Sequence, residues 1–420
     1  MAGTVWERLM SRTTILVGSV VYLLCCIAII LFWLPKDLTF VGDSKTYSLG
    51  AVNLLEMGTY SQDGIHPFIE REPLYSAFVA AIYSVFGLWN GLAVFVVQAV
   101  LYWFLSLFLS QKLVPILGKR TASIFLFLLL TSPSVFHGIF IVYREAFALI
   151  LLLGLSIAIL SILERYCLRT AILLGVLLGL LPLAYYSFIF LPLIVVLYLW
   201  YRNVPKKALM SMFVVTALIL SFWGFRNQRI DGHFRIIGSD RTTVMLYARG
   251  EQAERLHGVE PFLCLWSEYV SRDWTGRSDA CSVNSLMHRI WPSDAPSVDT
   301  ALAPLALKKI HSHFGWYLWD SLFQILELHL PFVGGGWPFL FNLFAAIGSA
   351  IVYLGCLVAF RSLFDRRMFF FVVLIAYNTA FFALIAATPR YLIPVSFCYA
   401  MFAAIGYDRL LTRLGFPSAR

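Results

Sequence analysis

Charged and hydrogen-bonding side chains recur where long apolar segments of this sequence begin or end. Five short stretches carry them: "FVGDSKTYSLG" at 40–50, "EREP" at 70–73, "YRE" at 143–145, "WGFRNQ" at 223–228 and "TPRYLIPV" at 388–395. A carboxylate can accept a proton from an attacking hydroxyl. The planar guanidinium of arginine matches a phosphate and stays charged near a membrane. Together these groups could move a substituent from a phosphate ester to a hydroxyl.

The same residues also have structural explanations. Asp43 or Ser44 could cap a helix over 44–57, because apolar residues follow with helical spacing and Gly58 suits the position after its end. The arginines of the other four stretches could be interfacial anchors or ion-pair partners of neighbouring glutamates. Charges at the edge of a membrane are costly unless they pair or face a wet cavity, so a collective role in binding an anion is favoured.

The elements that must position these groups are membrane-spanning helices. Hydrophobic residues make up 60% of the 420 residues, charged residues only 13%, and the mean hydropathy is +0.80. The apolar residues come in blocks of roughly 20, the length that crosses a bilayer. A soluble domain is excluded by this composition. The first apolar run is expected to be a retained helix, because no small-residue cleavage site follows it.

Ten spans are predicted, and basic residues orient them. They cover about 13–34, 91–111, 121–138, 145–163, 170–184, 186–201, 207–224, 336–360, 368–387 and 390–411. With the N-terminus in the cytosol, the cytosolic segments hold sixteen basic and four acidic residues, against sixteen basic and nineteen acidic residues outside. This asymmetry follows the positive-inside rule, and it places all five charged stretches at the outer face.

Two further segments are apolar but are not assigned as spans. The segment 74–89 is short, and counting it would reverse the charge asymmetry, so we expect a re-entrant or interfacial helix there. The segment 307–330 is rich in aromatic residues and carries Asp320 and Glu327, which indicates a helix at the outer interface. Three regions are expected: a transmembrane module at 1–224 with an external loop at 35–90, an external polar region at 225–335, and C-terminal spans at 336–420.

Other chemistries have weaker support in the sequence. There is no nucleotide-binding glycine pattern, no Asp-x-Asp motif for a nucleotide sugar with its metal, and no Gly-x-Ser-x-Gly elbow. His311, His313 and Glu327 lack the spacing of metal ligands. Basic residues form no long run, so no nucleic-acid partner is expected. Cys264 and Cys281 could form a disulfide if the polar region faces an oxidising compartment; free thiols are about equally compatible with the spacing.

The stretches "GDSKTYSLGAVNLLEMGTYS" and "REPLYSAFVAAIYSVFG" resemble the first external loop of the GT-C superfamily of glycosyltransferases. They are most similar to the dolichyl-phosphate-mannose protein mannosyltransferase-like branch, with its aminoarabinose and galacturonic acid transferases acting on lipid A. "YREAFALILLLGLSIAIL", "FWGFRN" and "PRYLIPV" resemble later elements of that branch, in the same order along the chain. The first loop here has one Asp where some relatives have an Asp-Glu pair, and Ser76 stands where many have proline.

The resemblance implies a GT-C-like helical bundle and an inverting transfer from a polyprenyl-phosphate sugar to a lipid, glycan or protein hydroxyl. It implies a catalytic pair: Asp43 is the base or the carboxylate that positions the acceptor, and Glu145 is a second acidic residue. The residues expected to bind the donor phosphate are Arg71, Arg226 and Arg390, with Lys45 and Arg144 as lesser candidates. Those expected to contact substrate are Glu70, Glu72, Tyr47, Asn227 and Tyr391. No cofactor is predicted; a divalent metal is possible but not required.

Two rival functions remain open at this stage, and both also use a lipid-linked glycan. A transporter or flippase should show broken or charged helices near the bilayer midplane and paired repeats; Pro182 and Pro192 are the only hints. An O-antigen ligase or polymerase would centre its chemistry on a long external loop such as 225–305. A multi-pass protein of a bacterial inner membrane, with its active site outside the cytosol, is the expected location.

Overall fold

The computed structural model describes residues 2–32, 43–69, 71–236, 246–250, 253–254, 302–330, 339–385 and 387–416. The predicted roles of Glu70, Cys264 and Cys281 fall outside these ranges. Within them the chain is helical, and the one β-type pairing is an isolated bridge between Ser61 and Pro67. The predicted all-α fold of a membrane protein is confirmed by these helices.

The chain divides into two compact units. The first comprises 1–237, 347–375 and 393–420, and the second comprises 238–346 and 376–392. The first unit therefore holds most of the predicted site residues, whereas Arg390 and Tyr391 belong to the second.

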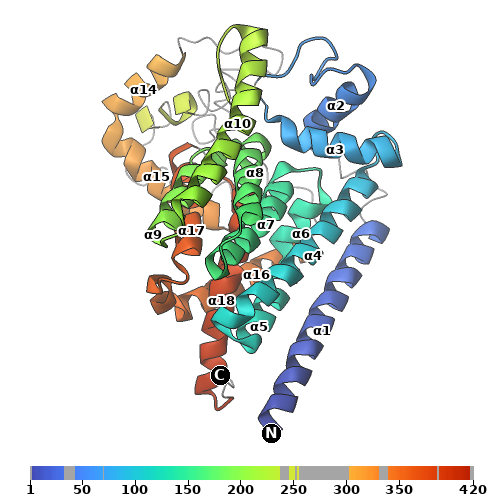
Figure 1. The fold of residues 1–420 in the computed structure, drawn as a ribbon, viewed down its shortest axis with the longest axis vertical. Helices are drawn as coiled ribbons and strands as arrows, with labels where there is room; N and C mark the ends of the chain where they lie inside the picture. The colour runs from blue at the N-terminus through green and yellow to red at the C-terminus, as the bar shows by residue number, and fades with distance from the viewer. Residues whose placement is uncertain are drawn as a thin grey trace. The chain divides into compact units, whose positions relative to one another are not determined.

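The first unit is a bundle of helices (Figure 1). Its elements are α1 (Ala2–Phe32), α2 (Asp43–Glu56), α3 (Pro73–Phe86), α4 (Gly91–Leu117), α5 (Lys119–Leu130), α6 (Pro133–Phe140), α7 (Arg144–Glu164), α8 (Leu168–Ala184), η2 (Tyr186–Phe188), α9 (Leu191–Tyr201), α10 (Lys206–Asp231), η3 (Phe360–Phe364) and α18 (Ser396–Arg413). Parts of α16 (Phe339–Val358), α17 (Phe369–Ile385) and η4 (Pro389–Val395) complete it. The segment predicted as one span at 121–138 is the bent pair α5 and α6, with a 49° bend. Pro133 explains the break, because proline donates no backbone hydrogen bond and disfavours helical backbone before it.

Several helices suit a bilayer by length and composition. Among the described residues, four helices are long and apolar enough to cross a membrane, or five if the bent α5–α6 pair counts as one span. Six shorter apolar helices accompany them, among them α3, α8 and α17. The predicted helix at 74–89 is present as α3, which has 14 residues.

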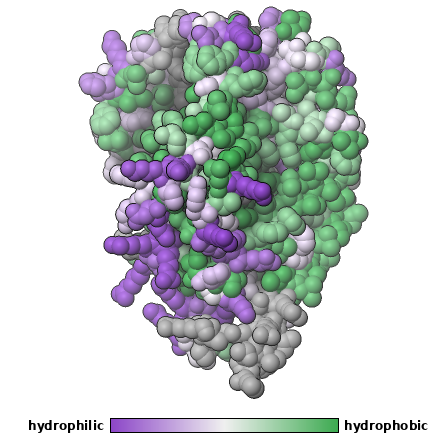
Figure 2. All heavy atoms as spheres, in the orientation of Figure 1, coloured by the Kyte–Doolittle hydropathy of each residue, from purple (hydrophilic) through white to green (hydrophobic). Residues whose placement is uncertain are grey.

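The outer surface of these helices is apolar. On α1, large apolar side chains such as Leu16, Leu23 and Leu31 are each about 60% exposed, and on α10 Phe222 is 77% exposed. Figure 2 shows apolar residues covering much of one face of the protein. Such a surface would be costly in water and is suited to lipid, so the chain is an integral membrane protein.

The two ends of the first unit are formed by different helices. Figure 1 places α2 and α3 at one end, and the N-terminus of α1 with the C-terminus of α18 at the other. At that second end, Arg120 at the start of α5 pairs with Asp408 and donates to Thr412 Oγ1 near the end of α18. Lys112 at the end of α4 pairs with Glu164 at the end of α7. Lys112 and Arg120 therefore lie at the end of the first unit opposite to α2 and α3.

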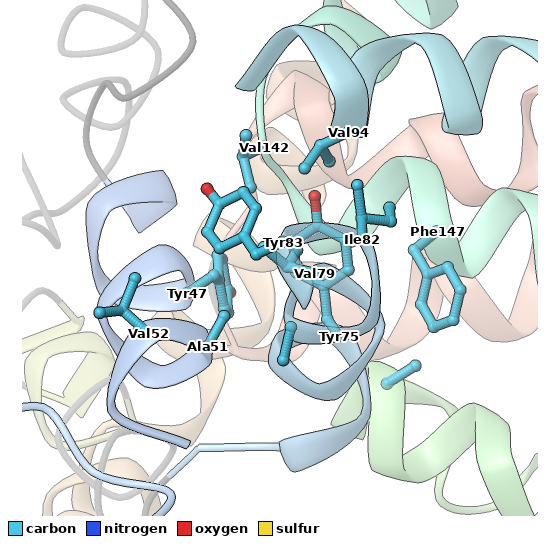
Figure 3. Packing of buried hydrophobic residues seen from close by; sticks show 12 residues of the cluster. Tyr47, Ala51, Val52, Tyr75, Val79, Ile82, Tyr83, Val94, Val142 and Phe147 are labelled. Atoms are coloured by element: carbon cyan, nitrogen blue, oxygen red, sulfur yellow. The ribbon is translucent and has the colours of Figure 1, made fainter. Parts of the chain in front are cut away.

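A tightly packed core holds α2 against α3 (Figure 3). Tyr47, Ala51, Tyr75, Val79 and Tyr83 meet there, each no more than 2% exposed. The hydroxyl of Tyr83 donates to Ser48 Oγ across the two helices at 3.1 Å. Burial of these rings fixes the helix that begins with Asp43.

Close packing of α8 against α10 places two more parts of the site. A Cβ at Gly175 would lie 2.7 Å from the carbonyl oxygen of Met212, and one at Gly179 would lie 2.9 Å from Ile219. Thr216 Oγ1 donates to the carbonyl of Gly175 at 3.0 Å. The helices can therefore approach this closely only with glycine at both positions. The α8 helix leads into η2, and the last turns of α10 carry Arg226.

The second unit contains α14 (Leu302–Ser312), α15 (Phe314–His329) and the C-terminal part of α17. The helical segment predicted at 307–330 is thus two helices, separated at His313. The polar face of α15 is buried and its aromatic face is exposed: Asp320 is 2% exposed, whereas Phe314 is 54% exposed and Trp319 is 43% exposed. The exposed aromatic face suits contact with lipid, and the polar face of α15 packs against protein.

A candidate active site at the start of helices α2, α3 and α7

The side chains of Asp43 and Arg71 form an ion pair, although 28 residues separate them. Arg71 Nη2 lies 3.4 Å from Asp43 Oδ1. Asp43 is the first residue of α2, where the helix dipole favours a negative charge. The Asp43 side chain is 19% exposed and that of Arg71 is 18% exposed, so a substrate can reach a pair that is largely shielded from water. Arg71 Nη1 is buried and has no hydrogen-bond partner in the described ranges, which leaves one donor for an anionic ligand.

The carboxylate of Glu72 joins the starts of three elements. It is the N-cap of α3 and pairs through Oε2 with Arg144, the first residue of α7. Its Oε1 accepts a hydrogen bond of 2.9 Å from the backbone N–H of Tyr186, which begins η2. Glu72 is 5% exposed and Arg144 is 7% exposed. The Arg144 guanidinium also lies 4.7 Å from the ring centre of Tyr185. These contacts enclose both side chains and favour a positioning role over direct substrate contact.

The ring of Tyr47 lies at the centre of this group of charges. Its ring centre is 5.4 Å from the guanidinium of Arg71 and 5.9 Å from that of Arg144. Burial raises the pKa of the Tyr47 phenol well above its ordinary value, and Asp43 and Glu145 add to this, while the two arginines oppose it. The phenol therefore stays protonated at neutral pH and cannot act as a general base. Between the Tyr47 phenol and the Asp43 carboxylate, only the carboxylate is suited to act as a general base.

A second tyrosine, Tyr60, links the charged group to the end of α10. Its hydroxyl donates to the backbone carbonyl of Glu72 at 2.9 Å. Its ring packs against Phe68 and Trp223, with centroids 5.1 Å and 6.3 Å away. Burial raises the pKa of the Tyr60 phenol, so this donor too is kept protonated. Tyr60 was not singled out in the sequence, because a lone tyrosine in a polar loop carries no distinguishing pattern.

The end of α10 fastens the loop that precedes Arg71. Arg226 Nη1 donates to the backbone carbonyl of Phe68 at 2.5 Å and to Asn227 Oδ1 at 2.9 Å. The Arg226 guanidinium also lies 4.6 Å from the ring centre of Trp223. Asn227 is fully buried and donates to the carbonyl of Arg235 at 2.8 Å. The described contacts of Arg226 are thus with the loop and its own helix rather than with Asp43.

Glu145 lies beside the same core. It is 2% exposed in the first turn of α7. Its charge acts on the phenols of both Tyr47 and Tyr75. The hydroxyl of Tyr75 donates to Gln98 Oε1 at 3.1 Å, and Gln98 Nε2 donates to the carbonyl of Ile139 at 2.9 Å. This buried chain of hydrogen bonds connects α3, α4 and α6.

The remaining predicted residues lie at the margin or in the other unit. Lys45, on α2, is exposed. In the second unit, the Arg390 guanidinium lies 5.3 Å from the ring centre of its neighbour Tyr391, whose carbonyl accepts a hydrogen bond from Asn378. Within the described chain, no three His, Cys, Asp or Glu side chains are arranged to hold a metal ion.

Three of the five charged stretches lie together in the structure. "FVGDSKTYSLG", "EREP" and "YRE" meet around Tyr47, through Asp43, Arg71, Glu72 and Arg144. Tyr185 and Tyr186, which complete the enclosure of Arg144, were not foreseen because they lie where two predicted apolar spans meet and no charged residue marks the place.

The fold and this group of residues define an integral-membrane, all-helical protein with a partly exposed carboxylate–guanidinium pair. No family model and no curated protein matches the chain. Among solved structures, it is similar to ArnT from Cupriavidus metallidurans bound to undecaprenyl phosphate, at 16% identity, over 93% of this chain and 78% of that one, with a TM-score of 0.43. It is also similar to the same protein in the apo state, at 15% identity, over 93% of this chain and 77% of that one, with a TM-score of 0.37.

Proposed function

We propose that the protein is a glycosyltransferase that moves a sugar from a polyprenyl-phosphate carrier to a hydroxyl, with inversion at the anomeric carbon. The observation that carries this proposal is the Asp43–Arg71 pair, a carboxylate and a phosphate-binding group held together at a partly exposed position of a membrane protein. General-base chemistry needs the carboxylate, and a phosphate leaving group needs charge neutralisation. The order of the GT-C-like motifs along the sequence agrees with this assignment.

The proposed reaction is a single displacement. Asp43 accepts the proton of the acceptor hydroxyl while that oxygen forms a bond to the anomeric carbon. The bond between this carbon and the phosphate oxygen breaks, and the electron pair leaves with the polyprenyl phosphate. Arg71, with its free Nη1 donor, and the exposed Lys45 neutralise the phosphate. Attack from the face opposite the leaving group inverts the anomeric configuration.

The other charged residues have supporting roles in this proposal. Glu72 and Arg144 hold the starts of α3, α7 and η2 together and so fix Tyr47 between the two guanidinium groups. Arg226 and Asn227 hold the loop before Arg71. Glu145 supplies a second negative charge beside Tyr47, and Arg390 in the second unit is assigned to the donor phosphate from its motif.

We place the reaction at the outer face of a bacterial inner membrane. The Asp43 group lies at the α2–α3 end of the first unit, and the ion pairs of Lys112 with Glu164 and of Arg120 with Asp408 lie at the other end, where the sequence places sixteen basic and four acidic residues. The positive-inside rule assigns the second end to the cytosol. The carrier lipid would be of the class of undecaprenyl phosphate, which is bound in the ArnT structure.

The lipid-linked-glycan transporter remains the second candidate, because the structure contains broken helices. The α8 helix ends two residues after Pro182 and is followed by η2, and α17 is followed by η4. A transporter would move its substrate without forming or breaking a glycosidic bond, so the product distinguishes the two functions. The ligase or polymerase alternative depends on residues 225–305, most of which lie outside the described chain.

The test is mass spectrometry of envelope lipids and glycans from cells lacking the gene, with and without a plasmid copy. The proposal expects one sugar to be absent from one acceptor and to return with the plasmid, together with accumulation of the polyprenyl-phosphate sugar. This result would name the sugar and the acceptor. An unchanged set of sugars in the deletion strain would contradict transferase activity.

A further inference from the structure

A fully buried arginine in the second unit is unexplained by the proposed reaction. Arg249 is 0% exposed, the largest side chain in the described chain to be so enclosed. Its guanidinium pairs with Asp320 of α15, which is 2% exposed. Its Nη2 donates to Ser321 Oγ at 2.9 Å, and it lies 5.2 Å from the ring centre of Tyr317. A buried ion pair costs desolvation and is weak evidence for stability, so its geometry is the informative feature.

The partners of Arg249 converge on the end of α17. Arg249 Nη2 also donates to the backbone carbonyl of Ala383 at 3.4 Å. The hydroxyl of Tyr317 donates to the carbonyl of Leu384 at 2.5 Å. The last carbonyls of a helix have no partner within the helix. Side chains from outside the helix therefore cap α17 at its C-terminus.

The same face of α15 also fixes the backbone beyond α17. Gln324 is 6% exposed, and its Oε1 accepts the N–H of Ala387 at 3.0 Å. Asn378 of α17 donates to the carbonyl of Tyr391 at 3.1 Å, and the ring of Phe382 stacks on that of Tyr391 with centroids 4.3 Å apart. Side chains therefore bind the carbonyls of Ala383, Leu384 and Tyr391 and the N–H of Ala387.

We propose that Arg249 and Gln324 are positioning residues that act on the reaction through Arg390. Arg390 follows Ala387 by three residues, and backbone groups beyond the end of a helix need such external hydrogen bonds to keep one conformation. Arg249 is too enclosed to touch a substrate, so its effect passes through the backbone at Ala383. This inference rests on the proposed function, in which Arg390 contacts the donor phosphate.

The test measures binding of undecaprenyl phosphate to the purified full-length protein in lipid nanodiscs. Four single variants are compared: Arg249→Lys, Gln324→Leu, Arg390→Gln and, as a control in the same unit, Lys309→Gln. Lys309 pairs with Glu254 at 2.5 Å through side chains that are 25% and 45% exposed, so its loss should leave the dissociation constant unchanged. Arg249→Lys keeps the positive charge beside Asp320 but loses one of the two terminal amino groups of the guanidinium. Gln324→Leu removes no charge, so it still tests the proposal if Arg249→Lys fails to fold.

We expect Arg249→Lys, Gln324→Leu and Arg390→Gln each to raise the dissociation constant about tenfold, with near-normal melting temperatures for the folded variants. Adding Arg249→Lys or Gln324→Leu to Arg390→Gln should then have no further effect, because the first two act through the third. Effects that multiply would refute the route through Arg390. Unchanged binding in both positioning variants, with weakened binding in Arg390→Gln, would refute the positioning role alone. Unchanged binding in Arg390→Gln would refute the phosphate role of Arg390 on which the inference rests.

Discussion

Replacing Glu72 should destabilise the protein through two separable contributions. Glu72→Gln leaves Arg144, which is 7% exposed, without its counter-ion. Removing one partner of a buried ion pair costs about 3–5 kcal/mol. The glutamine can still accept the N–H of Tyr186, whereas Glu72→Ala cannot. The alanine variant should therefore lose about 1–3 kcal/mol more, the cost of leaving a buried donor unpaired.

A double variant shows whether the uncompensated charge causes the loss. Glu72→Gln with Arg144→Met leaves neither member of this ion pair charged, and it should recover at least half of the loss of Glu72→Gln. A matched control is the pair Lys112–Glu164 at the other end of the unit, whose side chains are 33% and 48% exposed. Glu164→Gln should cost about 1 kcal/mol or less, as an exposed pair does.

The assay is reversible unfolding in mixed micelles, followed by circular dichroism and analysed as a double-mutant cycle. The expected order of stability is wild type and Glu164→Gln, then the double variant, then Glu72→Gln, then Glu72→Ala. A loss in Glu72→Gln no larger than in Glu164→Gln would refute the enclosed ion pair. A double variant as unstable as the sum of its parts would refute the argument from an uncompensated charge.

Three further outcomes follow from the site. Arg71→Ala should lower the rate of sugar transfer about tenfold or more, since it removes a charged donor beside Asp43. Steady-state rates measured against donor concentration check this. An unchanged dependence on donor concentration would show that Arg71 does not bind the donor phosphate. Tyr60→Phe should lower the free energy of unfolding by about 1 kcal/mol in the same micelle assay, because the hydrogen bond to the Glu72 carbonyl is lost. An unchanged free energy of unfolding would show that this hydrogen bond does not stabilise the protein. Arg226→Ala should speed hydrogen exchange of the amides between Tyr60 and Phe68, because the hydrogen bond to the Phe68 carbonyl is removed. Mass spectrometry measures this exchange. Amides that stay protected in the variant would show that other contacts hold the loop.

The helices could be predicted from the sequence because local patterns specify them. The helix expected over 44–57 is present as α2, and Gly58 after it has a φ of +67°, a backbone conformation that glycine adopts at no steric cost. The break between α5 and α6 was missed because periodicity continues across Pro133. The buried polar face of α15 was also missed, since a pattern with two faces does not reveal which one packs against protein.

The pairings within the site could not be predicted in the same way. Arg144 could be assigned to an anion or to a neighbouring glutamate, and the structure pairs it with Glu72, 72 residues earlier. Local spacing carries no information on such a contact, which depends on how α3, α7 and η2 pack. Asp43 could be proposed as a candidate base from its place after the first predicted span, but its contact with Arg71 depends on the course of the loop between them.

The central claim is that Asp43 is the base that deprotonates the acceptor, and one complementation measurement tests it most directly. Asp43→Asn is introduced into cells lacking the gene, at a protein level matched to wild type, and the sugar lost in the deletion strain is measured on its acceptor by mass spectrometry. Asparagine caps a helix about as well as aspartate but cannot accept the proton, so the fold should persist. The account predicts that wild type restores the sugar and Asp43→Asn does not. Full restoration by Asp43→Asn would contradict it and reduce Asp43 to the first residue of a helix.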